Sequence, residues 1–234
     1  MLAPYLAQHF WWMGSGDERM NNWTAWITQN VLLSAFTLPT SQEMRRAVVE
    51  KSLASLDAFL KDYAEDGACE EGVVYYRHAA LCLFGAMTVL ERVAPALVAP
   101  LWHVPKIRNM AEYSLHMHVA GDHYFNFADS AARVDACGAR EYLFGRAVGS
   151  QPLVDFAAAD FKRSKDCLMP REWNLWYRLQ ALSVAATIGD LEPQPVKMGD
   201  MFYPGIGLFI ARDQKFALAV KGGHNGESHN HNDV

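Results

Sequence analysis

The sequence has few cysteines and none of the paired motifs that bind metals or exchange disulfides. Four cysteines stand far apart in the 234-residue chain, and no C-x-x-C pair occurs. This spacing excludes a zinc knuckle and a dithiol redox motif, and no signal favours a lone catalytic cysteine. We therefore expect reduced, mostly buried thiols. The cysteines are Cys69, Cys82, Cys137 and Cys167.

The sequence also has no run of basic residues. Lys and Arg number 21 against 26 Asp and Glu, which gives a net charge of −5. This balance predicts no nucleic-acid partner and no membrane partner. No apolar stretch approaches the roughly 18 residues that span a bilayer, and Met1-Leu2-Ala3-Pro4 does not begin a signal peptide. The sequence as given predicts a soluble, cytoplasmic protein and carries no signal for an oligomeric state.

Hydrophobic residues make up 51% of the chain and aromatic residues 12%, which excludes a disordered protein. In residues 23–36, apolar side chains recur three and four positions apart, as on one face of a helix. Thr40 and Glu43 predict a capping box for the next helix, whose apolar face continues to Tyr63. Further helices are predicted over residues 75–93, 105–119, 140–148, 152–161 and 171–188.

The sequence pattern changes after Gly189. Residues 191–200 contain Pro193 and Pro195 and predict a linker, and residues 207–211 and 215–220 predict a β-hairpin. Two strands are fewer than the three that an independently stable sheet needs. The fold class predicted is mainly α, with the first strands of a β domain at the end. Serial antiparallel helices suit an α/α toroid or a helical solenoid, and the uneven turn lengths do not favour the solenoid.

The segment 222–233 carries the densest chemical signal, with three of the nine histidines of the chain. In a strand, His229 and His231 would project from the same face, where they could share a metal or divide between metal and substrate. The alternative is a solvated, histidine-rich loop. The preceding strands and the interleaved Asp233 favour a site.

Three further segments place polar residues beside aromatic ones. Residues 65–71 form an acidic turn before Tyr75 and Tyr76, and a tyrosine can act as acid or base beside a cation. Asn21-Asn22 could hydrogen-bond a substrate carboxylate. Residues 121–129 interleave aromatic and polar groups as sugar-binding clefts do. The alternatives are tyrosine packing at the edge of the core, an ordinary helix cap, and aromatic packing under a loop.

Taken together, these segments resemble the heparinase II/III-like family of polysaccharide lyases, in the order of that family and over nearly the whole chain. The closing pattern G-G-H-N-x-E-S-H-N-H-N-D-V is the most specific part. The other matching segments are Phe10-Trp11-Trp12-Met13, Asn21-Asn22-Trp23, Asp66-Gly67 to Tyr75, and Ala120-Gly121-Asp122 to Asp129.

The resemblance implies an incomplete α/α toroid in residues 1–190, without its N-terminal part. A linker at 191–200 and the truncated start of an antiparallel β-sandwich-like domain at 201–234 follow. It also implies β-elimination on uronic-acid-containing polysaccharides or oligosaccharides, in a cleft between the two domains. Because members of the family extend beyond both ends of these residues, the chain could be inactive.

The resemblance also implies roles for single residues. Asn21 and Asn22 match the amides that neutralise the uronate carboxylate. Tyr75, in preference to Tyr76, matches the acid/base, and His229 matches the active-site histidine. His231 matches a ligand of a structural zinc whose other ligands lie outside this chain. Trp23 stands where many relatives have histidine. The substrate-contacting candidates are Trp23, Glu71, Tyr76, Tyr124, Asn126 and His224.

Two other functions fit the sequence. A toroidal glycoside hydrolase needs two carboxylates across the scissile bond, and a non-catalytic carbohydrate-binding fragment needs none. The net charge of −5 favours a uronate glycan with little or no sulfate. The candidate carboxylates for a hydrolase are Asp66, Glu70, Glu71 and Asp129.

Overall fold

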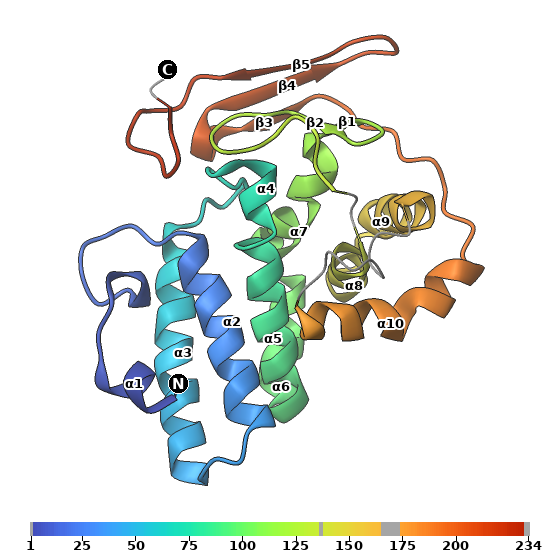
Figure 1. The fold of residues 1–234 in the computed structure, drawn as a ribbon. Coiled ribbons are helices and arrows are strands. Elements are labelled where there is room, and N and C mark those ends of the chain that lie inside the picture. The colour runs from blue at the N-terminus through green and yellow to red at the C-terminus, as the bar shows by residue number, and fades with distance from the viewer. Residues whose placement is uncertain (1, 136–137, 165–173, 232–234) are drawn as a thin grey trace.

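The protein is mainly helical and carries a small antiparallel sheet near its C-terminus, which confirms the predicted fold class at this level (Figure 1). A computed structural model describes residues 2–135, 138–164 and 174–231. The helices are α1 (Leu2–Ala7), α2 (Asn22–Thr37), α3 (Gln42–Asp62), α4 (Gly72–Tyr76), α5 (Ala80–Val93), α6 (Pro95–Val98), α7 (Pro105–Met117), α8 (Ala139–Ala147), α9 (Gln151–Ser164) and α10 (Leu175–Asp190). The strands are β1 (His118–Ala120), β2 (His123–Tyr124), β3 (Met201–Tyr203), β4 (Leu208–Arg212) and β5 (Ala217–Lys221).

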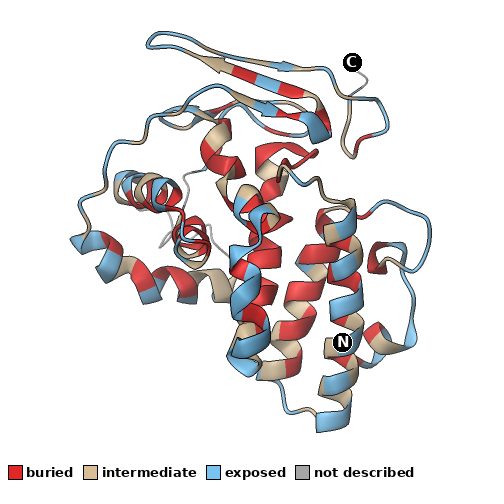
Figure 2. Cartoon of the chain, turned by 180° about the vertical axis from the view of Figure 1, so that it is seen from behind, coloured by how far each residue is buried: buried red, intermediate tan, exposed pale blue. Residues whose placement is uncertain are grey.

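The helices pack as two neighbouring groups joined through α7 (Figure 1). Helix α2 packs against α3 and α5, and α8 packs against α9 and α10. Helix α5 lies deepest, since every residue from 80 to 90 except Thr88 is buried (Figure 2).

The apolar segment around α5 corrects one prediction. By length and composition, Gly72–Val93 could cross a membrane, contrary to the expectation that no apolar stretch is long enough. Within the fold, 72% of its apolar window is buried inside the protein, as is usual for a core helix.

Two predicted helix boundaries are wrong. Helix α3 is capped by Ser41, whose hydroxyl accepts the Met44 N–H at 3.1 Å, whereas the Thr40 hydroxyl donates to the Ala35 carbonyl. The helix predicted over 75–93 is divided into α4 and α5 by a turn at residues 77–79. No glycine or proline marks this turn, so it has no local signal in the sequence.

The C-terminal sheet has three strands in the order β3-β4-β5, one more than the predicted hairpin. Strand β3 is only three residues long, too short to show alternation. Residues 191–200, before it, contain neither helix nor strand. The inner side of this C-terminal region joins the main hydrophobic core of the helices, and the sheet crosses one end of them (Figure 1). The residues that join this core are Tyr203, Ile206, Leu208 and Ile210.

Cys69 and Cys82 are free and buried, as expected. Cys137 and Cys167 lie outside the described residues, as do residues 171–173 of a predicted helix and residues 232–234 of the closing motif.

The turn before the acidic segment depends on glycine, and this generates a prediction. Gly67 has φ +77°, and a β-carbon there would lie 2.2 Å from the Asn109 carbonyl carbon. Gly67→Ala should lower the free energy of unfolding by about 3 kcal/mol, because strain and a clash with backbone act together. Urea denaturation measures this change.

Gly121 provides the matched control. It has φ +57°, and a β-carbon there would meet nothing within 4 Å. Gly121→Ala should cost only about 1 kcal/mol, from the left-handed backbone alone. Equal losses in the two variants would contradict the role given to the backbone of Asn109.

Candidate active site

Four segments that are far apart in the sequence meet beneath the C-terminal loop. The Asn22 backbone N–H donates to Glu71 Oε1 at 3.0 Å, and Glu71 Oε2 lies 3.2 Å from His229 Nε2. The other ring nitrogen of His229, Nδ1, contacts Asp129 Oδ2. The ring of Tyr75 stacks on His229 with centroids 4.2 Å apart. We call these five residues the histidine cluster.

Glu71 is the buried member of the histidine cluster. It is 2% exposed and lies directly before α4, against the N-terminus of α2. Burial raises the pKa of Glu71 to about 7, although the Asn22 N–H and His229 favour the ionised form. A large fraction of Glu71 is therefore protonated at neutral pH.

Asp129 is exposed and has the opposite shift. Hydrogen bonds to His231 and His229 lower the pKa of Asp129 below its usual value, so the group is ionised at neutral pH. Its Oδ1 lies 2.7 Å from His231 Nε2. The backbone is left-handed at Ala128 (φ 50°) and at His229 (φ 58°), on both sides of the contact. Such conformations are strained in non-glycine residues and persist where the surrounding structure fixes them.

The two tyrosines have different environments. Tyr75 is half-buried and stacks on His229 at an interplanar angle of 28°. Tyr76 is fully buried, and its hydroxyl donates to the Ala111 carbonyl at 3.0 Å. Tyr75 belongs to the histidine cluster, whereas Tyr76 packs in the core.

The two asparagines also differ. Asn21 is the N-cap of α2, and its Oδ1 accepts the Trp23 N–H at 3.0 Å. The side chain of Asn22 is 1% exposed, and neither atom of its amide has a partner among the described residues. A buried amide without partners costs about 1–3 kcal/mol, so Asn22 is the asparagine of the two whose amide keeps unused hydrogen-bonding capacity.

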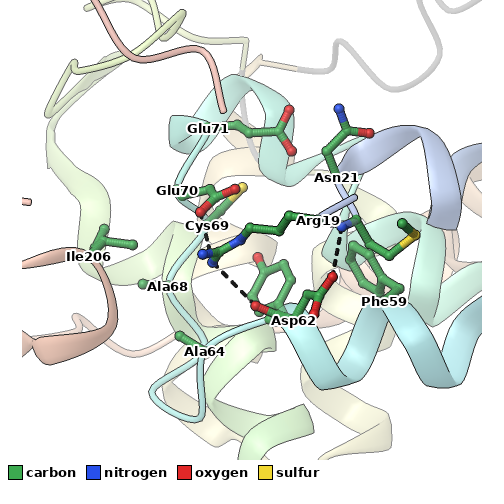
Figure 3. A pocket seen from close by; sticks show the side chains of 12 residues that line it. Arg19, Asn21, Phe59, Asp62, Ala64, Ala68, Cys69, Glu70, Glu71 and Ile206 are labelled. Carbon is green, nitrogen blue, oxygen red and sulfur yellow. Dashed lines mark hydrogen bonds and ion pairs between the residues drawn. The ribbon is translucent and has the colours of Figure 1, made fainter. Parts of the chain in front are cut away.

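A small cavity lies behind Glu71 (Figure 3). Its volume is about 20 Å³, enough for a single water molecule. Arg19 lines it and reaches Glu70, with Nη2 of the guanidinium 2.8 Å from Oε2 of the carboxylate. Burial raises the pKa of Glu70, and the charge of Arg19 opposes this. Glu70 is thus paired with a permanent cation, whereas Glu71 faces a histidine.

The C-terminal loop is shaped by an ion pair that sequence reasoning missed. Lys221 contacts Glu227, whose side chain is 2% exposed. A β-carbon at Gly223 would lie 2.4 Å from Glu227 Oε1 and 2.6 Å from Lys221 Nζ. The glycine therefore leaves room for the pair, and the closing motif has a structural part in addition to its histidines.

The predicted binding residues around the histidine cluster are spread over several environments. Trp23 is 48% exposed and lies beside Trp11, with ring centroids 6.0 Å apart. Tyr124 is buried against His118, and Asn126 is exposed. His224 is exposed, and its Nδ1 accepts the N–H of Gly226 within the loop.

Residues 222–231 form turns and not a strand, so His229 and His231 do not share a strand face. They meet instead at the two oxygens of Asp129. Within the described ranges, no group of three or more His, Cys, Asp or Glu side chains is arranged to hold a metal ion. Structural zinc takes four ligands, and the described residues do not complete such a site around His231.

Asp129 ends a segment that matches the family, but the sequence assigned it a chemical role only as a candidate hydrolase carboxylate. It lies 100 residues from His229, and no spacing rule connects the two. No protein-family model and no curated protein matches the chain. The heparinase II/III-like resemblance therefore remains a prediction from the motifs.

The burial of Glu71 generates a prediction about pH. Its folded pKa of about 7 lies above the ordinary value of 4.5, so ionisation favours the unfolded chain as pH rises between these values. Glu71→Gln removes this effect. As the pH rises from 4.5 to about 7, the free energy of unfolding of the variant should therefore increase relative to that of wild type, by up to about 3 kcal/mol. Urea denaturation over the pH range measures the difference.

Asp129→Asn is the control with the opposite sign. The pKa of Asp129 is lowered, so its contribution to stability is present above the ordinary carboxyl pKa and is lost in acid. The variant should be less stable than wild type above the ordinary carboxyl pKa, and the difference should shrink as the pH falls below that value. The same pH trend in both variants would contradict the assigned environments.

Proposed function

We propose that the chain is a lyase that cleaves uronic-acid-containing glycans by β-elimination. In this proposal its helices form an incomplete α/α toroid, and its sheet begins a β-sandwich-like domain. The observation that carries the proposal is the stack of Tyr75 on His229, which Glu71 connects to the backbone N–H of Asn22. The buried side-chain amide of Asn22 has no partner among the described residues. A titratable hydroxyl, an imidazole and a free amide are the groups that the reaction needs in one place.

In the proposed reaction, the Asn22 amide donates a hydrogen bond to the uronate carboxylate. This offsets the charge that develops when the C5 proton leaves. A base removes the C5 proton. The electron pair of the broken C5–H bond then forms the C4–C5 double bond as the C4–O bond breaks. Tyr75 is assigned the proton transfers, and the leaving oxygen takes up a proton.

His229 is assigned to orient and polarise this centre. Its two ring nitrogens face Glu71 and Asp129, so the imidazole cannot turn without losing a carboxylate contact. Its face covers the ring of Tyr75. Asn21, with its oxygen committed to the helix cap, is assigned a structural role.

The charge around the histidine cluster supports a substrate with little or no sulfate. Glu70, Glu71 and Asp129 are acidic, and Arg19, which contacts Glu70, is paired with it. A densely sulfated chain would be repelled there. The proposed substrate class is an unsulfated or sparsely sulfated uronate oligosaccharide or polysaccharide.

A glycoside hydrolase is the second candidate, because Glu71 and Asp129 have pKa values shifted in opposite directions. Such a pair suits an acid and a base. However, both carboxylates contact the same imidazole, which lies where a sugar would have to bind. A lyase product carries a double bond that absorbs ultraviolet light, and a hydrolase product does not. Oligosaccharide binding without any product would favour a non-catalytic binding protein.

Tyr75→Phe tests the proposed acid/base. The variant keeps the ring that stacks on His229 and loses only the hydroxyl, so turnover should fall at least about a thousandfold with unchanged stability. The measurement is ultraviolet absorbance with a panel of glycosaminoglycan, alginate and glucuronan oligomers.

Tyr76→Phe is the matched control. It removes a buried hydroxyl that donates to the Ala111 carbonyl, and should lower stability by about 1 kcal/mol while keeping activity. Full turnover in Tyr75→Phe would overturn the mechanism.

A further inference from the structure

A buried cation without a counter-ion lies beside the histidine cluster. Arg140, on α8, is 8% exposed, and its Nη2 donates to the Leu81 carbonyl at 2.6 Å. Its guanidinium lies 3.6 Å from the ring centroid of Tyr177 on α10. Among the described residues Arg140 forms no ion pair, and its buried Nε has no acceptor. In the part of the chain that the structure describes, the guanidinium is therefore held by a carbonyl, an aromatic face and a 3.9 Å contact of Nη2 with Cys82 Sγ.

The neighbouring carboxylate of Glu141 favours the charge of Arg140 from a distance but forms no ion pair with it. Glu141 follows Arg140 in α8, but its Oε2 accepts the Gly138 N–H at 2.9 Å. Its Oε1 lies 3.8 Å from Nε of Arg77. Arginine cannot lose its proton in a protein, and a buried charge without a partner is costly. A bound anion would offset that cost.

His78 connects Arg140 with the histidine cluster. Its Nδ1 is buried and has no partner among the described residues. Its ring centroid lies 6.2 Å from that of Tyr75 and 4.4 Å from that of Trp26, which is 37% exposed. Burial and the charges of Arg140 and Arg77 lower the pKa of His78 to about 4. His78 is therefore neutral at pH 7 and can donate a hydrogen bond without adding charge.

The remaining neighbours fix Arg140 in place. Gln29 Nε2 donates to the Tyr177 hydroxyl at 3.1 Å, and Cys82 Sγ lies 3.4 Å from the same oxygen. These contacts hold the tyrosine ring under the guanidinium. A cation fixed by three other helices, with an unused N–H, has the preorganisation that anion recognition needs.

We propose that Arg140 and His78 form a second subsite, which binds the carboxylate of the sugar unit next to the one at Tyr75. The guanidinium Nε–H and the His78 Nδ1–H donate to the carboxylate, and Trp26 lies beside the sugar ring. The identity of the ligand rests on the proposed function, whereas the anion subsite rests on Arg140 itself.

Binding of sodium glucuronate, with glucose and sodium sulfate as comparison ligands, tests the subsite. Calorimetry is done on wild type, Arg140→Met and Arg146→Met, where Arg146 is an exposed arginine of the same helix. Glucuronate should bind wild type more tightly than sulfate or glucose. Its affinity should fall at least about tenfold in Arg140→Met and stay unchanged in Arg146→Met. Equal affinity in wild type and Arg140→Met, or tighter binding of sulfate, would overturn the proposal.

Thermal unfolding separates binding from folding. Without ligand, Arg140→Met should unfold at or above the wild-type temperature, because it replaces an unpaired buried cation by an apolar side chain. Glucuronate should raise the unfolding temperature of wild type and leave that of Arg140→Met unchanged. If Arg140→Met does not fold, the test uses His78→Leu, whose affinity for glucuronate should also fall about tenfold. Wild-type affinity for glucuronate in His78→Leu would overturn the proposal.

Activity distinguishes this subsite from the proposed reaction. Arginine-dependent glucuronate binding without unsaturated product from any uronate oligomer would uphold the subsite and contradict the lyase. Unsaturated product formed with equal kcat/KM by wild type and Arg140→Met would uphold the lyase and overturn the subsite.

Discussion

The buried carboxylate of Glu71 is the interaction on which the candidate site depends. One oxygen accepts the backbone N–H of Asn22 at the start of α2, and the other faces His229 in the C-terminal loop. Burial keeps this carboxyl group partly protonated at neutral pH. The same group thus fixes a helix start, orients an imidazole and limits the negative charge beside Tyr75.

That arrangement requires the sheet to be held firmly on the helices. Tyr203 and Ile210 belong to the main hydrophobic core. The Gly205 N–H donates to Asp66 at 2.7 Å, and Arg212 donates to the His116 carbonyl at 2.6 Å. These contacts fix β3 and β4, β5 pairs with β4, and the loop that carries His229 follows β5 directly. The position of His229 therefore depends on the packing of the sheet against the helices as well as on its own contacts.

Much of the secondary structure was predictable because it depends on neighbours in sequence. Apolar spacing of three and four residues located α2 and α3, Gly- and Pro-bearing turns bounded α7, and β-type runs located β4 and β5. The short elements α1, α6, β1, β2 and β3 were not predicted, and β1 begins within the helix predicted over 105–119. The turn between α4 and α5, which contains no breaker residue, was not predicted either. The arrangement of the helices as a toroid remains a prediction, because periodicity does not define how helices are ordered around an axis.

The sequence by itself determined the mainly helical class and the candidate chemistry of Asn22, Tyr75 and His229, because residue type and local spacing carry that information. Tertiary structure decided that Tyr75 and not Tyr76 faces His229, and that Asn21 is consumed by the helix cap. It also decided that Asp129 joins His229 to His231 and that Arg140 is buried without a carboxylate partner among the described residues. These outcomes depend on contacts across as many as 102 residues of chain, and on burial, which only the packed fold defines.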